Sequence, residues 1–188
     1  MDPAKQKKID ELDMLMGRII RIWSNVDFHL MLILAGIVCN PDLARARIIW
    51  ASMMNFRAKR ELIVRLGESY LPEKSLERFR ALMAQVKHLS EKRNMIAHDR
   101  VLGPWEDPIS FHNDQDPTQP NTFGRFSNVQ RGNLKSWIKE LEDLANALLR
   151  FHGEIVTSPL LEKPRLLPEQ PDDPSPDSDP AQGGDAKQ

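Results

Sequence analysis

The sequence predicts an all-α protein, a four- to five-helix bundle with a short β-hairpin or loop insert before its last helix. Apolar residues recur at steps of three and four along most of residues 9–155, the spacing that puts them on one side of an α-helix. Between residues 100 and 129 this spacing gives way to short apolar patches separated by Pro and Gly. We therefore expect one bundle domain over residues 1–157, with its insert at residues 100–129.

Residues 158–188 are predicted to form a disordered tail. Seven of the fourteen prolines lie from Pro159 onward, and this segment holds almost no aromatic or β-branched residues. Such a composition cannot bury enough apolar surface to fold. Residues 169–188 carry a net charge of −5, which leaves +4 on residues 1–168 of a chain whose formal net charge is −1. A mildly basic body is compatible with an anionic ligand.

The first predicted helix ends before Asn40-Pro41. Its apolar stripe keeps the spacing of three and four without a gap, through Ile9, Leu12, Met16, Ile19, Trp23, Val26, Leu30, Ile33 and Ile37. Further apolar residues flank the stripe: Leu15, Ile20, Ile22, Phe28, Leu32 and Leu34. One bundle seam needs less apolar surface than this helix offers, so we expect a homodimer.

The second predicted helix runs from Pro41-Asp42 to about Tyr70, where Leu71-Pro72 ends it. Its basic residues lie mostly on the outer side, where solvated side chains are the ordinary interpretation. The third helix covers roughly Lys74 to His98, and Gly103-Pro104 follows its end. After the insert, the last helix repeats the apolar spacing through Leu134, Trp137, Leu141, Leu144, Leu148, Phe151 and Ile155.

Several classes of protein and site are excluded by composition. The lone Cys39 cannot form a disulfide within the chain, and the five histidines show no metal-ligand spacing, so we expect no metal and no cofactor. The charged N-terminal residues do not resemble a signal peptide. The longest apolar run, Phe28 to Cys39, is too short to span a bilayer. We expect a soluble cytoplasmic protein with no membrane partner.

The segment that ends the third helix carries the candidate site. Arg93 occupies the apolar stripe formed by Leu82, Val86, Leu89 and Ile96, so the sequence predicts a buried guanidinium. Burying an unpaired charge costs roughly several kcal/mol, so the arginine needs either a partner or a ligand. His98 follows just over one helical turn later, and a permanent cation beside a group that titrates near neutrality suits the handling of phosphate.

Two interpretations of this segment are open from the residues alone. In the structural one, His98 caps the helix and the arginine pairs with a carboxylate from a set of candidates: Glu11, Glu61, Glu68 or Glu91. In the functional one, His98 is a general acid or base, Arg93 stabilises a phosphoryl group, and Asn94 orients the histidine or a ribose.

The nine residues Glu91 to Asp99 resemble the signature of the HEPN family (higher eukaryotes and prokaryotes nucleotide-binding domains). That signature has Arg, a polar residue, three further residues and His at the end of a helix in an all-α bundle. The upstream stretch Phe56 to Ile63 is similar to a helix that precedes the signature in many bacterial members.

The resemblance implies a homodimer whose two Arg-His motifs meet in one cleft and, in many members, metal-independent cleavage of RNA. There the 2′-hydroxyl attacks the adjacent phosphate and leaves a cyclic phosphate end. By position, Arg93 and His98 are the active pair and Asn94 is their polar neighbour. The family also contains inactive members and toxins that pair with a nucleotidyltransferase antitoxin, so an antitoxin-like partner protein is implied too.

The leading hypothesis from the sequence is therefore a HEPN-like endoribonuclease of toxin or defence type. The alternative is a non-catalytic homodimeric module that binds RNA, a nucleotide or a protein partner through the same cleft. Among the tryptophans, Trp23 and Trp137 lie on apolar stripes and are predicted to be packing residues, whereas Trp50 and Trp105 stay open as candidates for base stacking.

Overall fold

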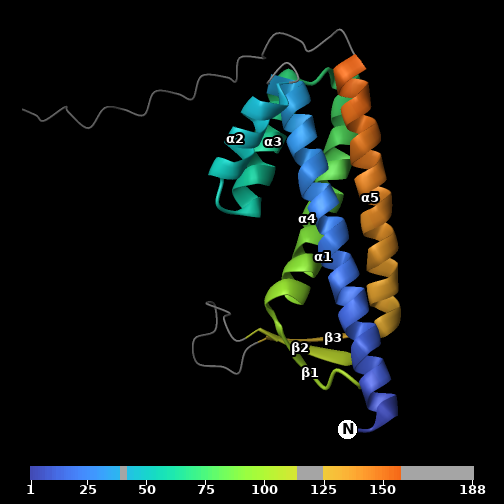
Figure 1. Ribbon diagram of the computed structural model, residues 1–188. Helices are drawn as coiled ribbons and strands as arrows, with labels where there is room; N and C mark the ends of the chain where they lie inside the picture. Colours follow the sequence, from blue (N-terminus) through green and yellow to red (C-terminus); the bar gives the residue numbers. More distant parts are fainter. Residues whose placement is uncertain (39–41, 114–124, 158–188) are drawn as a thin grey trace, which may run out of the picture.

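A computed structural model describes residues 1–38, 42–113 and 125–157 of the chain. The described residues form five helices and one antiparallel sheet, which confirms a mainly helical fold (Figure 1). In chain order the elements are α1 (Pro3–Val38), α2 (Leu43–Ser52), α3 (Phe56–Tyr70), α4 (Glu73–His98), β1 (Arg100–Leu102), β2 (Ile109–Asn113), β3 (Arg125–Val129) and α5 (Arg131–Thr157). The predicted tail, residues 158–188, lies outside the described residues, as does Cys39.

The core is built around α1 and α5, which lie side by side along most of their lengths (Figure 1). The apolar stripes predicted for both helices are largely buried, including Leu12, Ile19, Val26, Leu30 and Ile33 of α1 and Leu134, Leu141, Leu144, Leu148 and Phe151 of α5. The apolar residues that flank the α1 stripe differ in burial. Phe28 is 52% exposed, whereas Leu34 is buried.

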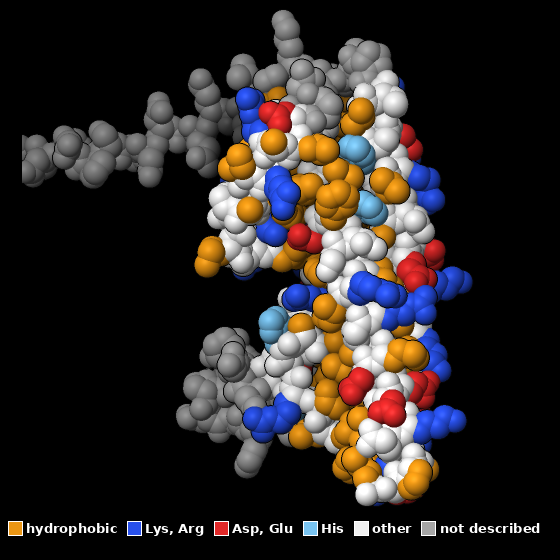
Figure 2. All heavy atoms as spheres, in the orientation of Figure 1, with side chains coloured by type: hydrophobic (Ala, Val, Ile, Leu, Met, Phe, Trp, Pro, Cys, Tyr) orange, Lys and Arg blue, Asp and Glu red, His pale blue; other side chains and the backbone are white. Residues whose placement is uncertain are grey.

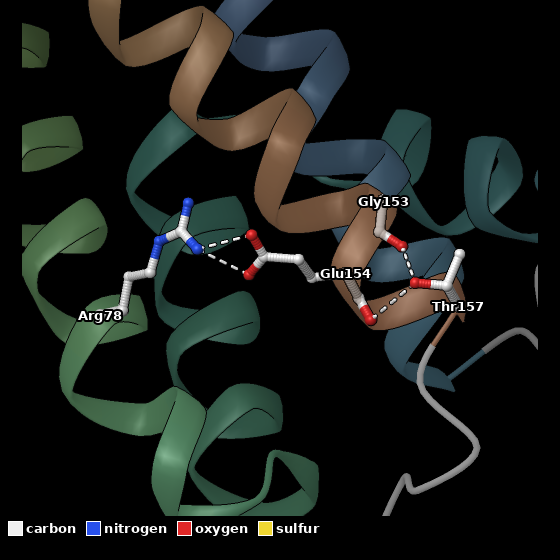
Figure 3. Close-up of polar contacts among 4 residues, drawn as sticks. All are labelled: Arg78, Gly153, Glu154 and Thr157. Atoms are coloured by element: carbon white, nitrogen blue, oxygen red, sulfur yellow. Dashed lines mark hydrogen bonds and ion pairs between the residues drawn. The ribbon is translucent and has the colours of Figure 1, made fainter.

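Helix α4 is fixed to both of its neighbours. One guanidinium nitrogen of Arg78 donates to both carboxylate oxygens of Glu154 on α5 at 2.6 Å, and these side chains reach toward one another between the two helices (Figure 3). Beneath this ion pair, Phe79 stacks on Phe151 with ring centroids 5.9 Å apart. On the α3 side, a Cβ at Gly67 would lie 2.3 Å from the Phe79 ring, so only glycine allows this close approach.

The prediction of one continuous helix from Pro41-Asp42 to Tyr70 is wrong. The chain leaves the helix at Met53, which is extended, and restarts it at Asn55, whose side chain accepts a hydrogen bond from the Ala58 N–H at 2.8 Å. An asparagine in this position satisfies an N–H group that a helix start leaves unpaired. After the break, α3 packs against the middle of α1, where Phe56 meets Trp23, and its Lys59 reaches the Trp50 ring of α2 (Figure 1).

The predicted hairpin or loop insert contains a three-stranded antiparallel sheet in the order β1-β2-β3. Arg100 pairs with His112 and Ile109 with Val129, so the sheet begins two residues after His98. Ile109 and Phe111 are fully buried and attach the sheet to the bundle.

The start of α5 is held by Arg131, the only charged residue that is buried among the described residues. Its guanidinium donates to the backbone oxygen of Lys8 at 3.0 Å and to that of Pro104, and its backbone N–H donates to Asp107 at 3.3 Å. This side chain therefore joins the start of α1, the loop after β1 and the start of α5. Backbone partners of this kind leave no trace in the sequence pattern.

Within the described residues, α1 is the one helix that is long and apolar enough, by length and composition, to cross a bilayer. Its most apolar window has a mean hydropathy of 1.3, and 61% of that window is buried inside the protein. A core helix of a soluble protein has the same properties, so this finding alone is weak evidence for a membrane span.

Candidate functional site

A cleft of about 1020 Å³ opens between the middle of α1, the start of α3 and the second half of α4. We call it the cationic cleft. Figure 2 shows the hollow between the α2–α3 pair and the sheet, with Lys, Arg and His side chains beside it. Arg93, Asn94 and His98 all line the cleft, so the structure brings the three sequence-predicted residues to one surface.

Positive charge dominates the described lining of the cleft. Five cationic side chains contribute, namely Arg57, Lys59, Arg60, Lys87 and Arg93, against the carboxylates of Asp27 and Glu91. Two of the cations are engaged: Arg57 with Glu61 at 2.7 Å and Lys59 with Asp27 at 3.5 Å. Arg60 and Lys87 have no ion-pair partner in the part of the chain that the structure describes. A concave surface with a surplus of cations attracts an anion such as a phosphodiester.

Arg93 is half-buried rather than fully buried, because α4 borders the cleft at this turn. Its Nη1 donates to Oδ1 of Asn94 at 3.1 Å, and its Nε is enclosed without a hydrogen-bond partner. No described carboxylate forms an ion pair with it. Enclosed donors that lack an acceptor are uncommon, and the Nδ1 of His29 and the Nε of Arg131, outside the cleft, are enclosed in the same way. The Arg93 Nε differs from them because it lies at a basic cleft that an anion can enter.

The carboxylates that the structural interpretation assigns to Arg93 are elsewhere. Three of them pair with other cations: Glu11 with Lys135 at 2.9 Å, Glu61 with Arg57 at 2.7 Å, and Glu68 with Arg80 at 3.4 Å. The fourth, Glu91, lines the same cleft but makes no ion pair with Arg93. The predicted ion pair is therefore absent among the described residues.

His98 is the last residue of α4 and its side chain is exposed in the cleft. Its imidazole makes no hydrogen bond with any described residue. The helix end is instead closed by Asp99, whose backbone N–H donates to the Met95 oxygen at 2.9 Å. A solvent-accessible imidazole that makes no structural hydrogen bond can contact a ligand in the cleft.

Asn94 is exposed and lies one turn before His98 on the same side of the helix. Its carbonyl oxygen is held by Arg93, and no hydrogen bond joins it to His98 in the described part of the chain. Asn94 therefore does not orient the histidine in this structure. Its amide oxygen accepts from the Arg93 guanidinium instead.

One cluster at the cleft was not found from the sequence. Asp27 accepts from the indole N–H of Trp50 at 3.0 Å and from Lys59 at 3.5 Å, and the Lys59 ammonium lies 4.8 Å from the centroid of the Trp50 ring. Next to it, Trp23 and Phe56 meet edge to face at 4.8 Å. This cluster ties α1 to α2 and α3. An acid amid the apolar residues of α1 was its one visible signal.

The four tryptophans have different environments. Trp23 is a buried packing residue, as predicted, and Trp50, which the sequence left open, is 5% exposed and also packs. Trp105 is 37% exposed beneath the ammonium of Lys5, which lies 5.2 Å from the ring centroid. Trp137, predicted to be a packing residue, is only half-buried. The stripe that contains Trp137 therefore reaches the edge of the core.

A second hollow of about 570 Å³ lies between the end of α4, the sheet and the start of α5, and Trp137 forms part of its wall. We call it the indole pocket. Glu91, Asn94 and His98 line both hollows, so the last turns of α4 stand between them. In the described ranges, no group of three His, Cys, Asp or Glu residues is arranged to hold a metal ion.

Comparison of the chain with protein-family models, with curated proteins and with solved structures gave no match. The HEPN resemblance therefore rests on the sequence motif at the end of α4.

Proposed function

We propose that this chain is a homodimeric, metal-independent endoribonuclease of the HEPN type, with its site in the cationic cleft. The observation that supports it most is the state of Arg93, half-buried in a basic cleft, without a carboxylate partner and with an enclosed, unpartnered Nε. Water solvates the exposed part of this cation in the free protein, and an anionic ligand in the cleft would take the place of that water.

The cleft offers the groups that cleavage by the 2′-hydroxyl needs. His98, in its neutral form, would take the proton of the 2′-hydroxyl while the 2′-oxygen forms a bond to phosphorus. The bond between phosphorus and the 5′-oxygen then breaks, leaving a 2′,3′-cyclic phosphate. Arg93 would neutralise the charge that develops on the non-bridging oxygens. Asn94, which holds the guanidinium, is a positioning residue in this scheme.

The departing 5′-oxygen needs a proton, and each chain brings one cleft histidine, His98. In a dimer that brings two copies of α4 together, the partner's His98 in its protonated form would supply it. Exposed apolar side chains favour such an assembly: Met54, which lines the cleft, is 97% exposed, and Phe28 on α1 and Ile48 on α2 are 52% and 71% exposed. The family resemblance extends the proposal to a cytoplasmic toxin or defence role with an antitoxin partner.

The test is incubation of the purified full chain with single-stranded RNA of mixed sequence in excess chelator. We expect cleavage with cyclic phosphate ends, lost when 2′-deoxynucleotides replace ribonucleotides. Arg93→Ala and His98→Ala should each reduce the rate by about a hundredfold or more. Matched controls lie on the same helix outside the cleft: Arg80→Ala and the exposed His88→Ala should cleave like the wild type. RNA that binds in the cleft without cleavage would favour the non-catalytic module instead.

A further inference from the structure

The indole pocket differs in chemistry from the cationic cleft although the two share one wall. Its described lining includes Trp137, Met95 and Val129, the hydroxyl of Ser127 and the amide of Asn113. The single lysine there, Lys92, is bound to Glu140 at 3.0 Å, and its ammonium lies 5.1 Å from the centroid of the Trp137 ring. This surface has no surplus of cations to offer a phosphate.

An aromatic wall with a few polar groups is the combination that binds a nucleobase of single-stranded RNA. Bases contact aromatic side chains through their faces, and their edges form hydrogen bonds with amides and hydroxyls. The volume of about 570 Å³ lies within the range of small-molecule pockets. The Trp137 ring already contacts the Lys92 ammonium, which Glu140 holds in place, and a ring restrained in this way loses less freedom when a base contacts it.

The indole pocket lies directly beside the cationic cleft, because the last turns of α4 form a wall of both. Asn94 and His98 face both hollows, so a phosphodiester held at the cationic cleft has its neighbouring nucleotide within reach of the indole pocket. We propose that the indole pocket is a base subsite that holds the nucleobase next to the phosphate handled by Arg93 and His98. This inference rests on the proposed function, because it assumes that single-stranded RNA occupies the cleft.

Binding of 2′-O-methyl RNA tests the subsite without cleavage, since the methylated 2′-oxygen cannot attack. Affinities are measured by fluorescence anisotropy for a labelled short oligonucleotide and for a series in which one abasic residue is moved along it. For the wild-type protein, we expect one abasic position to weaken binding by about tenfold. In Trp137→Leu that same abasic residue should change affinity by less than about twofold, because the contact it removes is already gone.

Two variants separate this contact from general damage. Trp137→Phe keeps an aromatic face and should retain most of the effect of the abasic residue. Trp105→Leu removes an exposed indole outside both hollows and should bind every oligonucleotide like the wild type. Equal sensitivity of wild type and Trp137→Leu to every abasic position would overturn the subsite. Wild-type protein that binds no RNA would overturn the proposed function and the subsite together.

A second measurement needs no variant at position 137. RNA carrying one photoreactive 5-iodouracil base is crosslinked to the wild-type protein, and the attached residue is identified by mass spectrometry. Crosslinks at Trp137 or at other residues of the indole pocket support the subsite. Crosslinks confined to residues outside it, with RNA binding intact, would reject the subsite and leave the proposed function standing.

Discussion

Replacing Arg93 with alanine separates a structural role of this residue from a functional one. If the guanidinium completed a buried ion pair, its removal would cost about 3 to 5 kcal/mol, because a carboxylate would remain buried alone. The contacts of Arg93 in the structure predict a smaller loss of stability. Arg93 is half-buried, its one hydrogen bond goes to the exposed Asn94, and no described carboxylate loses a partner. Loss of that bond and of the packed aliphatic stem should cost about 1 kcal/mol.

For a domain of this size, such a change lowers the melting temperature by about 2 to 4 °C. The rate of RNA cleavage should fall by about a hundredfold or more, the scale for removing a group that stabilises a transition-state charge. Thermal unfolding and cleavage are measured on the same preparations of wild type, Arg93→Ala, Arg93→Lys and the Arg80→Ala control. The reasoning is refuted if Arg93→Ala melts more than about 10 °C lower while its remaining folded fraction cleaves normally.

Four further outcomes are expected. Cleavage should persist in excess chelator, measured by gel; activity that vanishes with chelator and returns with magnesium would contradict acid-base chemistry by His98. The chain should sediment as a dimer at micromolar concentration, and Phe28→Asp should shift it toward monomer because Phe28 is 52% exposed on α1; a wild-type monomer would argue against a shared cleft. Deletion of residues 169–188 should leave the melting temperature unchanged, and a drop of several degrees would show that the tail packs on the domain. Burial lowers the pKa of His29, and burial together with His29 lowers that of His152, so the folded chain binds fewer protons than the unfolded one. The free energy of unfolding, from urea titrations, should therefore be level above about pH 6.5 and fall as the pH drops below it, less steeply in His29→Gln; an increase below pH 6.5 would contradict this.

Helix boundaries could be predicted wherever apolar spacing and chain breakers agreed. The stripe of α1 and the stop before Asn40-Pro41 match a helix that ends at Val38, and α4 ends at His98 as expected. The break between α2 and α3 could not be predicted in this way, because Asn55 falls between the stripe positions Met53 and Phe56 and leaves their spacing of three intact. The Asn55 side chain accepts a hydrogen bond from the Ala58 N–H, and this local bond favours a helix start over a continuous helix. The spacing of apolar residues carries no information about such a bond.

The sequence predicted three residues that line one cleft, but it did not predict what surrounds them. Periodicity assigned Arg93 to a buried stripe, because it assumes that a partner helix covers the whole of that stripe. Here α4 passes the start of α3 and faces a cleft instead. The pocket wall contributed by Trp137 was equally hidden, since a residue at the edge of the core has the same spacing as one at its centre.

Of the two acids that line the cleft in the described residues, Glu91 forms no ion pair with Arg93, and Asp27 is held by other groups. Asp27 lies in the same cleft, but both of its oxygens are engaged, one by the indole of Trp50 and the other by Lys59. Because Asp27 is committed to joining α1 to α2 and α3, its charge is matched before it can reach the guanidinium. The same contacts position the start of α3 and determine which cation of the cleft is neutralised, Lys59 rather than Arg93. Asp27 thus has two effects: it joins α1 to α2 and α3, and it neutralises Lys59 rather than Arg93. The Arg93 guanidinium is therefore available to a phosphate.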